Sequence, residues 1–171
     1  MIKLVNGRGQ LGNALSNKIS NFNTTNEDVY LYHTWNIDDK SKSNQIKEYN
    51  KFVSFVDNHK DKRIVFVSTS SQKNNWYNYY KHLSESYLLI NNENSVIIRL
   101  PTLVGKGVFE SFRDRDIGAY GQIELMLIED AADIILEKCV TDSKIKNFHI
   151  SGEKVSAKVV KELILFGKRN E

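Results

Sequence analysis

The sequence predicts an α/β fold in which helices cover both faces of a mostly parallel sheet. Short apolar runs rich in β-branched residues alternate along the chain with longer segments whose apolar residues recur at helical spacing. A glycine-rich turn joins the first apolar run to the first helical segment. Because regular alternation of strands and helices favours parallel pairing, the whole chain is expected to form one layered domain.

The elements follow from these patterns in chain order. Strands are expected at 2–5, 29–32, 63–68, 95–100, 123–128 and 147–150. Helices are expected directly after the glycine-rich turn, over 41–58, from about Tyr77 to Ile90, over 130–140 and after Ser156, which is a favoured type of N-cap. Residues 105–121 carry several glycines and charges and are expected to be irregular, after Pro101 has ended the preceding strand.

Composition places the chain among ordinary globular proteins. It has 171 residues, 40% hydrophobic and 26% charged, and a formal charge of +3 that is too small and dispersed to indicate nucleic-acid binding. The lone Cys139 excludes an internal disulfide and a cysteine-rich zinc site, and we expect it to be buried in a helix. The four histidines lack metal-ligand spacing, so no metal is expected. No apolar run is long enough to span a bilayer, which favours a soluble cytoplasmic protein without a membrane partner.

The glycine-rich turn has the pattern of a phosphate-binding loop. Gly7, Gly9 and Gly12 match G-x-G-x-x-G directly after a strand and at the start of a helix. Such glycines let the backbone approach a pyrophosphate, whose charge is stabilised at a helix N-terminus. We interpret the whole segment as a nucleotide- or dinucleotide-binding loop, and a tight turn without ligand is the alternative. The segment is Gly7-Arg8-Gly9-Gln10-Leu11-Gly12.

The choice between NAD and NADP depends on Arg8 and on the next strand. NAD-binding proteins often carry an acidic residue about twenty positions after the loop, where it binds the adenosine ribose. Residues 30–34 contain no carboxylate, whereas Arg8 could face a 2′-phosphate. This favours NADP over NAD. The alternative is that the Arg8 side chain points to solvent.

A hydroxyl-rich segment and a Tyr–Lys pair suggest hydride-transfer chemistry. The strand at 63–67 ends in Ser68-Thr69-Ser70-Ser71, and Tyr77 and Lys81 follow four residues apart on one helix face. Open α/β sheets bind ligands at the carboxyl ends of their strands, which is where this segment falls. The alternative is a surface helix with an exposed tyrosine and lysine.

Taken together, these residues resemble the extended short-chain dehydrogenase/reductase family, the NAD-dependent epimerases and dehydratases. Within it the loop looks most like that of sugar-nucleotide reductases related to dTDP-4-dehydrorhamnose reductase. The similar segments are Gly9–Gly12, Phe66–Ser70, Tyr77 with Lys81, Arg99–Gly105, Leu127–Asp133 and Phe148–Ser156. The resemblance therefore extends over nearly the whole chain.

The resemblance implies a Rossmann-like, doubly wound fold and a catalytic role for four residues. Tyr77 would be the general acid/base, and Lys81 would hold the nicotinamide ribose and lower the Tyr77 pKa. Thr69 or Ser70 would hydrogen-bond the substrate oxygen. The candidates for binding a substrate diphosphate are Arg99, Lys106, Arg113 and Arg115.

The implied activity is an NAD(P)-dependent reduction or epimerisation of a nucleotide-activated sugar in surface polysaccharide biosynthesis. A homodimer through the helix that carries Tyr77 and Lys81 would also fit the family. The alternative function is a catalytically inactive module that binds a ligand or a partner. The domain expected over 1–171 has a reduced substrate-binding part at about 105–171.

The chain also departs from the family pattern. Members are commonly near twice its length, and the units that normally carry their second and third strands are largely absent here, with much of the adenosine pocket. Six residues separate Ser70 from Tyr77, fewer than in the usual active-site loop. Asn6 stands where the family's G-x-x-G-x-x-G form has its first glycine.

Overall fold

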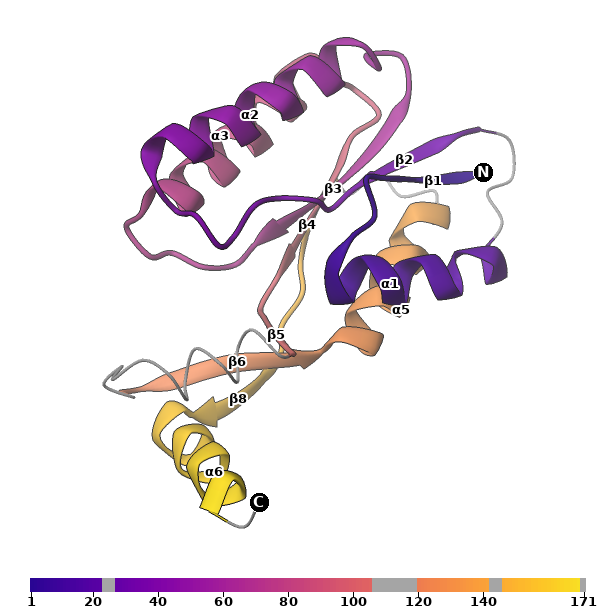
Figure 1. The fold of residues 1–171 in the computed structure, drawn as a ribbon. Coiled ribbons are helices and arrows are strands. Elements are labelled where there is room, and N and C mark those ends of the chain that lie inside the picture. Colours follow the sequence, from indigo (N-terminus) through magenta and orange to yellow (C-terminus); the bar gives the residue numbers. More distant parts are fainter. Residues whose placement is uncertain (23–26, 106–119, 142–145, 170–171) are drawn as a thin grey trace.

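A computed structural model describes residues 1–22, 27–105, 120–141 and 146–169 and arranges them in two sheets with flanking helices (Figure 1). The larger sheet is parallel throughout, in the order β1-β2-β3-β4-β7. Its strands are β1 (Ile2–Val5), β2 (Val29–Tyr32), β3 (Arg63–Thr69), β4 (Val96–Leu100) and β7 (Asn147–His149). The expected Rossmann-like, mostly parallel α/β architecture is confirmed.

Helices cover both faces of the larger sheet. One face packs against α1 (Gly9–Lys18) and α5 (Ile128–Val140), and the other packs against α2 (Lys42–Asp57) and α3 (Trp76–Asn91) (Figure 1). A short 3-10 turn, η1 (Ile19–Asn21), follows α1. No helix within the described ranges is long and apolar enough to cross a membrane.

A second, smaller sheet forms from β5 (Thr102–Val104), β6 (Gln122–Leu127) and β8 (Glu153–Ser156). β6 pairs parallel with β5 and antiparallel with β8, and the C-terminal helix α6 (Ala157–Arg169) contacts β8. The sequence pattern does not predict β5 or β8. Both are short and lack buried residues, so they carry no clear alternation of apolar and polar side chains.

The core lies on both sides of β3. Val65 and Val67 belong to the apolar cluster under α1 and α5, whereas Ile64 and Phe66 belong to the cluster under α2 and α3. Successive side chains of a strand point to opposite faces, so a strand covered on both faces reads as one continuous apolar run. In the second cluster Phe66 meets Phe52 of α2 at a ring-centroid distance of 4.4 Å.

Two helices begin at residues whose side chains cap them. The Ser41 hydroxyl accepts from the Asn44 N–H at 3.4 Å before α2, and the Asn75 amide oxygen accepts from the Asn78 N–H at 2.9 Å before α3. Such caps satisfy backbone donors that have no partner within the helix. The cap at Asn75 fixes where α3 begins and therefore where Tyr77 lies.

The three simple β-α-β connections do not share one hand. From β1 to β4 each connection steps in the same direction across the sheet, but α1 lies on the opposite face from α2 and α3. Parallel crossovers that step the same way on opposite faces have opposite hands. Since about 98% of such crossovers are right-handed, the connection through α1 is the left-handed one.

Candidate functional site

The candidate site lies where the parallel strands end. The glycine loop after β1, the 33–41 connection after β2 and the 70–75 connection after β3 all begin at this edge of the sheet. The chain leaves β1 toward α1 on one face and leaves β2 toward α2 on the other. Ligand crevices of open α/β sheets form where neighbouring connections separate in this way.

The glycine loop leaves the N-terminus of α1 without a side-chain cap. Arg8 is the extended N-cap residue, its side chain makes no cap hydrogen bond, and the first turn holds no acidic residue. Gly9 has a φ of +73°, and an added Cβ would meet no atom within 4 Å. The loop therefore presents backbone donors and open space, which is what a diphosphate needs.

The remaining loop residues serve packing. An added Cβ at Gly12 would lie 3.0 Å from the Gly7 carbonyl carbon and 3.1 Å from the His33 ring. Leu11 packs against the core cluster under α1, and the Gln10 side chain lies beside Gly105.

His33 lies at the end of β2, against Gly12. Burial lowers the pKa of His33 to about 4, and the positive charges of Lys81 and Arg8 act in the same direction. His33 is therefore neutral at pH 7. Its Nε2 is buried without a hydrogen-bond partner among the described residues.

Asn6 adopts the backbone conformation that usually requires glycine. Its φ is +51°, in the left-handed region where asparagine is among the better tolerated residues. The Thr34 hydroxyl donates to the carbonyl oxygens of Val5 at 2.9 Å and Asn6 at 2.8 Å, which ties the loop to the end of β2. The departure from the family glycine pattern at Asn6 is thus accommodated by the backbone.

Tyr77 is partly buried near the start of α3, with its phenol near the Thr69 hydroxyl. Burial raises the pKa of Tyr77 to about 12, and the nearby Thr69 hydroxyl opposes this only in part. The phenol is therefore protonated at neutral pH. The Ser70 hydroxyl is buried without a partner in the described part of the chain, and its backbone N–H donates to the Leu100 carbonyl at 2.9 Å.

Lys81 points into the core. Its side chain is buried, and Nζ donates to the Val67 carbonyl oxygen at 2.7 Å. Nζ also lies 4.5 Å from the ring centroid of Phe66 and 4.8 Å from that of Trp35. Burial lowers the pKa of Lys81 to about 7, although the carboxylates of Glu85 and Glu48 raise it.

The four basic candidates for a substrate diphosphate are in different situations. Arg99 of β4 forms a bidentate ion pair with the buried Glu85 of α3, with Nε 3.1 Å from both carboxylate oxygens and a third contact at 2.5 Å. Its guanidinium is thus engaged within the fold. Lys106, Arg113 and Arg115 lie outside the described residues.

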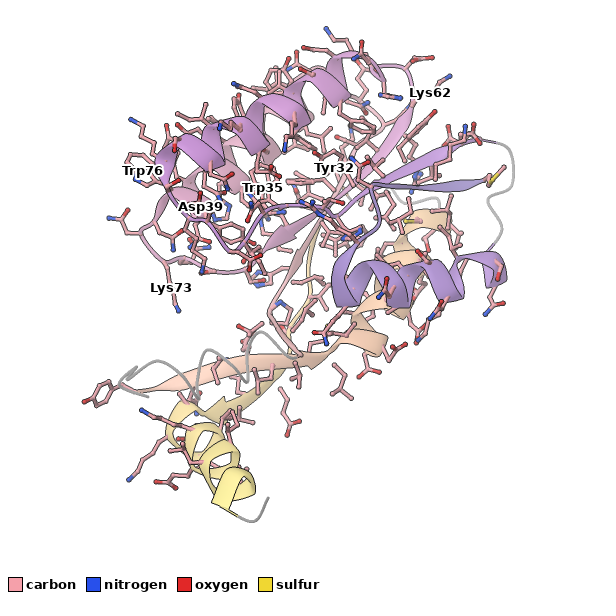
Figure 2. All side chains as sticks on the ribbon, in the orientation of Figure 1. Tyr32, Trp35, Asp39, Lys62, Lys73 and Trp76 are labelled. Carbon is pink, nitrogen blue, oxygen red and sulfur yellow. The ribbon has the colours of Figure 1, made fainter. Side chains whose placement is uncertain are left out.

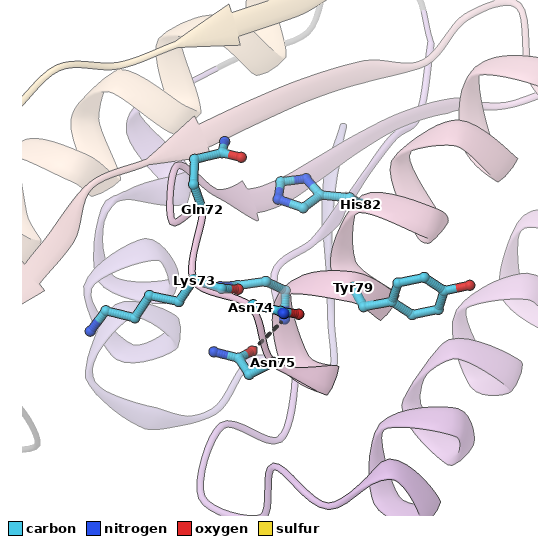
Figure 3. A pocket seen from close by; sticks show the side chains of 7 residues that line it. Gln72, Lys73, Asn74, Asn75, Tyr79 and His82 are labelled. Carbon is cyan, nitrogen blue, oxygen red and sulfur yellow. Dashed lines mark hydrogen bonds between the residues drawn. The ribbon is translucent and has the colours of Figure 1, made fainter.

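A pocket beside α3 was not expected from the sequence. It encloses about 320 Å³, and amide side chains dominate its lining (Figure 3). The lining residues come from 72–75 and from Asn78, Tyr79 and His82. Asn78 is buried and donates to the Ser71 hydroxyl at 3.0 Å and to the Lys73 carbonyl at 2.7 Å, so the pocket borders the hydroxyl-rich segment. The run of amides between Ser71 and Tyr77 is the signal that could have found it.

Trp35 is a second residue that the sequence interpretation did not single out. It follows β2 and lies between the sheet and the two helices above it (Figure 2). Its position just beyond the carboxyl end of a strand is the signal that could have marked it.

The site fits one part of a dinucleotide better than another. The α1 N-terminus suits a diphosphate, whereas Lys81 would have to leave the Val67 carbonyl to reach a ribose. The described residues contain no group of three or more His, Cys, Asp or Glu side chains placed to hold a metal ion.

The fold is shared with enzymes of known structure, sugar-nucleotide enzymes among them. WbmG from Bordetella bronchiseptica, in complex with NAD, matches with a TM-score of 0.72 and 12% identity over 96% of this chain and 76% of that one. A dTDP-4-dehydrorhamnose reductase from Clostridium acetobutylicum matches with a TM-score of 0.69 and 16% identity over 96% and 79%. TunA, an NAD-dependent NDP-hexosamine 5,6-dehydratase, matches with a TM-score of 0.71 and 11% identity over 98% and 81%.

No protein-family model and no curated protein sequence matches the chain. The structural matches, at 11–16% identity, confirm at the level of the fold the resemblance that the sequence motifs indicated.

Proposed function

We propose that this protein is an NAD(P)-dependent reductase or epimerase of the short-chain dehydrogenase/reductase type that acts on a nucleotide-activated sugar. The observation that carries the proposal is the position of the Tyr77 phenol near the Thr69 hydroxyl, at the strand edge where the uncapped glycine loop also lies. The structural neighbours support it, since one is a complex with NAD and UDP and another is a sugar-nucleotide reductase. Surface polysaccharide biosynthesis in the cytoplasm is the setting that such a substrate favours.

The nicotinamide cofactor would supply or accept the hydride when bound. The N-terminus of α1 and the open position at Gly9 would hold its diphosphate. Arg8 is exposed at the start of this helix, which favours NADP over NAD because a guanidinium binds phosphate well.

Tyr77 is suited to donate a proton. Its phenol is protonated at neutral pH because burial raises the pKa, and the buried Lys81 amine at a pKa near 7 is only partly charged and does little to favour phenolate. A protonated Tyr77 beside a substrate carbonyl oxygen would act as general acid, with Thr69 orienting its hydroxyl. This favours reduction over the reverse oxidation.

The amide-rich pocket supports a sugar as the substrate. Amide groups donate and accept hydrogen bonds, as the hydroxyls of a sugar ring require, and the half-exposed ring of Tyr79 offers a face for its apolar side. Asn78 links this pocket to Ser71, two residues from Thr69. Lys106, Arg113 and Arg115 remain the candidates for the substrate diphosphate, and Arg99 could take this role only by leaving Glu85.

Calorimetry with NADH and NADPH, each alone and with UDP- or dTDP-sugars, tests the proposal. We expect micromolar to millimolar binding of at least one cofactor, the range common for enzyme substrates. Tyr77→Phe should keep this affinity and reduce turnover by at least about a hundredfold, as general acid catalysis typically contributes. Tyr87→Phe is the matched control on the same helix, because the Tyr87 hydroxyl donates to Asp57 of α2 and not into the site, and it should leave turnover unchanged. If neither NADH nor NADPH binds, alone or with a nucleotide sugar, the proposed enzymatic function is excluded.

A second function, an inactive ligand- or partner-binding module, is favoured by the burial of Lys81. It predicts binding of a nucleotide sugar without hydride transfer. A homodimer through α3 would fit either function, since Trp76 and Tyr79 are 44% and 56% exposed on that helix. Analytical ultracentrifugation of the wild type and of Tyr79→Glu checks it.

A further inference from the structure

Trp35 is fixed in place by a buried glutamine. Its indole N–H donates to the Gln45 amide oxygen at 2.7 Å, and Gln45, at the start of α2, is fully buried. The Gln45 amide nitrogen donates in turn to the carbonyl oxygens of Asn36 at 2.9 Å and Asp39 at 2.7 Å. One side chain thus anchors both the indole ring and the connection from β2 to α2 that carries it.

The anchored indole forms one wall of a closed compartment around Lys81. The other walls are the Phe66 ring and the Val67 carbonyl, and Lys81 is 3% exposed. Phe66 is a fixed wall because it belongs to a central strand and packs on Phe52. Trp35 belongs to the connection between β2 and α2 and not to a strand or helix, so it is the wall that the secondary structure constrains least.

The same connection also contacts Tyr77. Lys40 lies at its far end, with Nζ 5.9 Å from the Tyr77 ring centroid. Movement of the connection would therefore expose the Lys81 amine and the Tyr77 ring together.

We propose that Trp35 is a positioning residue that gates Lys81: with Trp35 seated on Gln45 the amine is held against Val67, and displacement of the ring releases it toward a ligand. The consequence for cofactor binding rests on the proposed function, because only that function gives Lys81 a ribose to bind. The gate itself is a property of the free protein.

Amine labelling followed by peptide mass spectrometry tests the gate without any cofactor. Trinitrobenzenesulfonate should label Lys81 at least tenfold more slowly than the exposed Lys47 in the wild type, although burial makes the Lys81 amine easier to deprotonate. In Trp35→Ala the Lys81 rate should rise at least tenfold relative to Lys47. Trp35→Phe keeps a ring and should retain most of the protection. Trp76→Ala removes an exposed tryptophan and should change nothing.

A pH series separates gating from a general loosening of the fold. In Trp35→Ala the midpoint of Lys81 labelling should move upward from near pH 7, because water reaches an amine that still faces Glu85, Glu48 and His33. If Trp35→Ala fails to fold, Gln45→Met releases the indole without truncating it and should give the same result. Rapid labelling of Lys81 in the wild type, or continued protection in both folded variants, would overturn the inference.

Cofactor titration of the same variants keeps the two proposals apart. If the proposed function holds, Trp35→Ala should bind NADH or NADPH more tightly than the wild type. If Lys81 labelling changes in the variants but no cofactor binds, the gating proposal stands and the proposed enzymatic function is excluded.

Discussion

At the residue scale, the fold isolates Lys81 more completely than its sequence motif implies. A lysine four residues after a tyrosine predicts two side chains on one helix face. The structure turns Lys81 inward to Val67 while Tyr77 meets Thr69. The difference arises because the aromatic residues around Lys81, which are Trp35 and Phe66, come from other elements. The spacing of residues along α3 contains no information about them.

Lys81→Met should remove a pH dependence of stability. The Lys81 pKa is about 7 in the folded protein and 10.5 in its unperturbed state, so between these values the unfolded chain binds more protons. The wild-type free energy of unfolding should therefore rise from pH 7 to pH 9, by at most about 1.4 kcal/mol per pH unit.

Urea denaturation at pH 7, 8 and 9 measures this, and the Lys81→Met curve should be flatter over that interval. Lys47→Met is the control, since Lys47 is exposed and should leave the slope at its wild-type value. Parallel curves for wild type and Lys81→Met would show that the amine is not buried in solution.

At the element scale, most of the larger sheet could be predicted from sequence. The strand at 63–69 is buried on both faces and gives a continuous apolar run, and the strand at 96–100 gives a shorter run of the same kind. β5 and β8 could not be predicted, because each is short and partly exposed. Their pairing depends on β6, which lies between them, and long-range pairing leaves no local periodicity.

The turn between β7 and β8 should tolerate no side chain at Gly152. A Cβ there would lie 2.4 Å from the Leu125 carbonyl oxygen of β6 and 3.0 Å from the Pro101 ring. Both contacts involve rigid groups, so Gly152→Ala should lower the free energy of unfolding by about 1–3 kcal/mol, the range for overpacking. Thermal unfolding measures this, with the exposed Ser151→Ala as its neighbour control. An unchanged melting temperature would mean that the smaller sheet is not formed as described.

At the scale of the whole molecule, β1 is the edge of the larger sheet among the described residues. In dinucleotide-binding folds the strand beyond the first one carries the group that binds the adenosine ribose. The departures from the family pattern predicted that the units carrying this strand and the next are largely absent here. The sequence could not predict the strand order of the larger sheet, because that order depends on the long-range pairing of β2 with β1.

With β1 at the edge of the sheet, the adenosine half of a dinucleotide is expected to add little to its affinity. If the proposed function holds, reduced nicotinamide mononucleotide should bind within about tenfold of NADH, a difference of about 1.4 kcal/mol. Competition calorimetry measures the ratio, with AMP as the control ligand, which should bind weakly or not at all. A much tighter binding of NADH would mean that adenosine has a site of its own.

The left-handed crossover through α1 has a consequence for where the larger sheet can be extended. A right-handed unit with α1 on its present face would place its next parallel strand on the far side of β1, where the described sheet ends. A regular right-handed unit through α1 could therefore be added to the described sheet only beside β1, and its new strand would make β1 an interior strand.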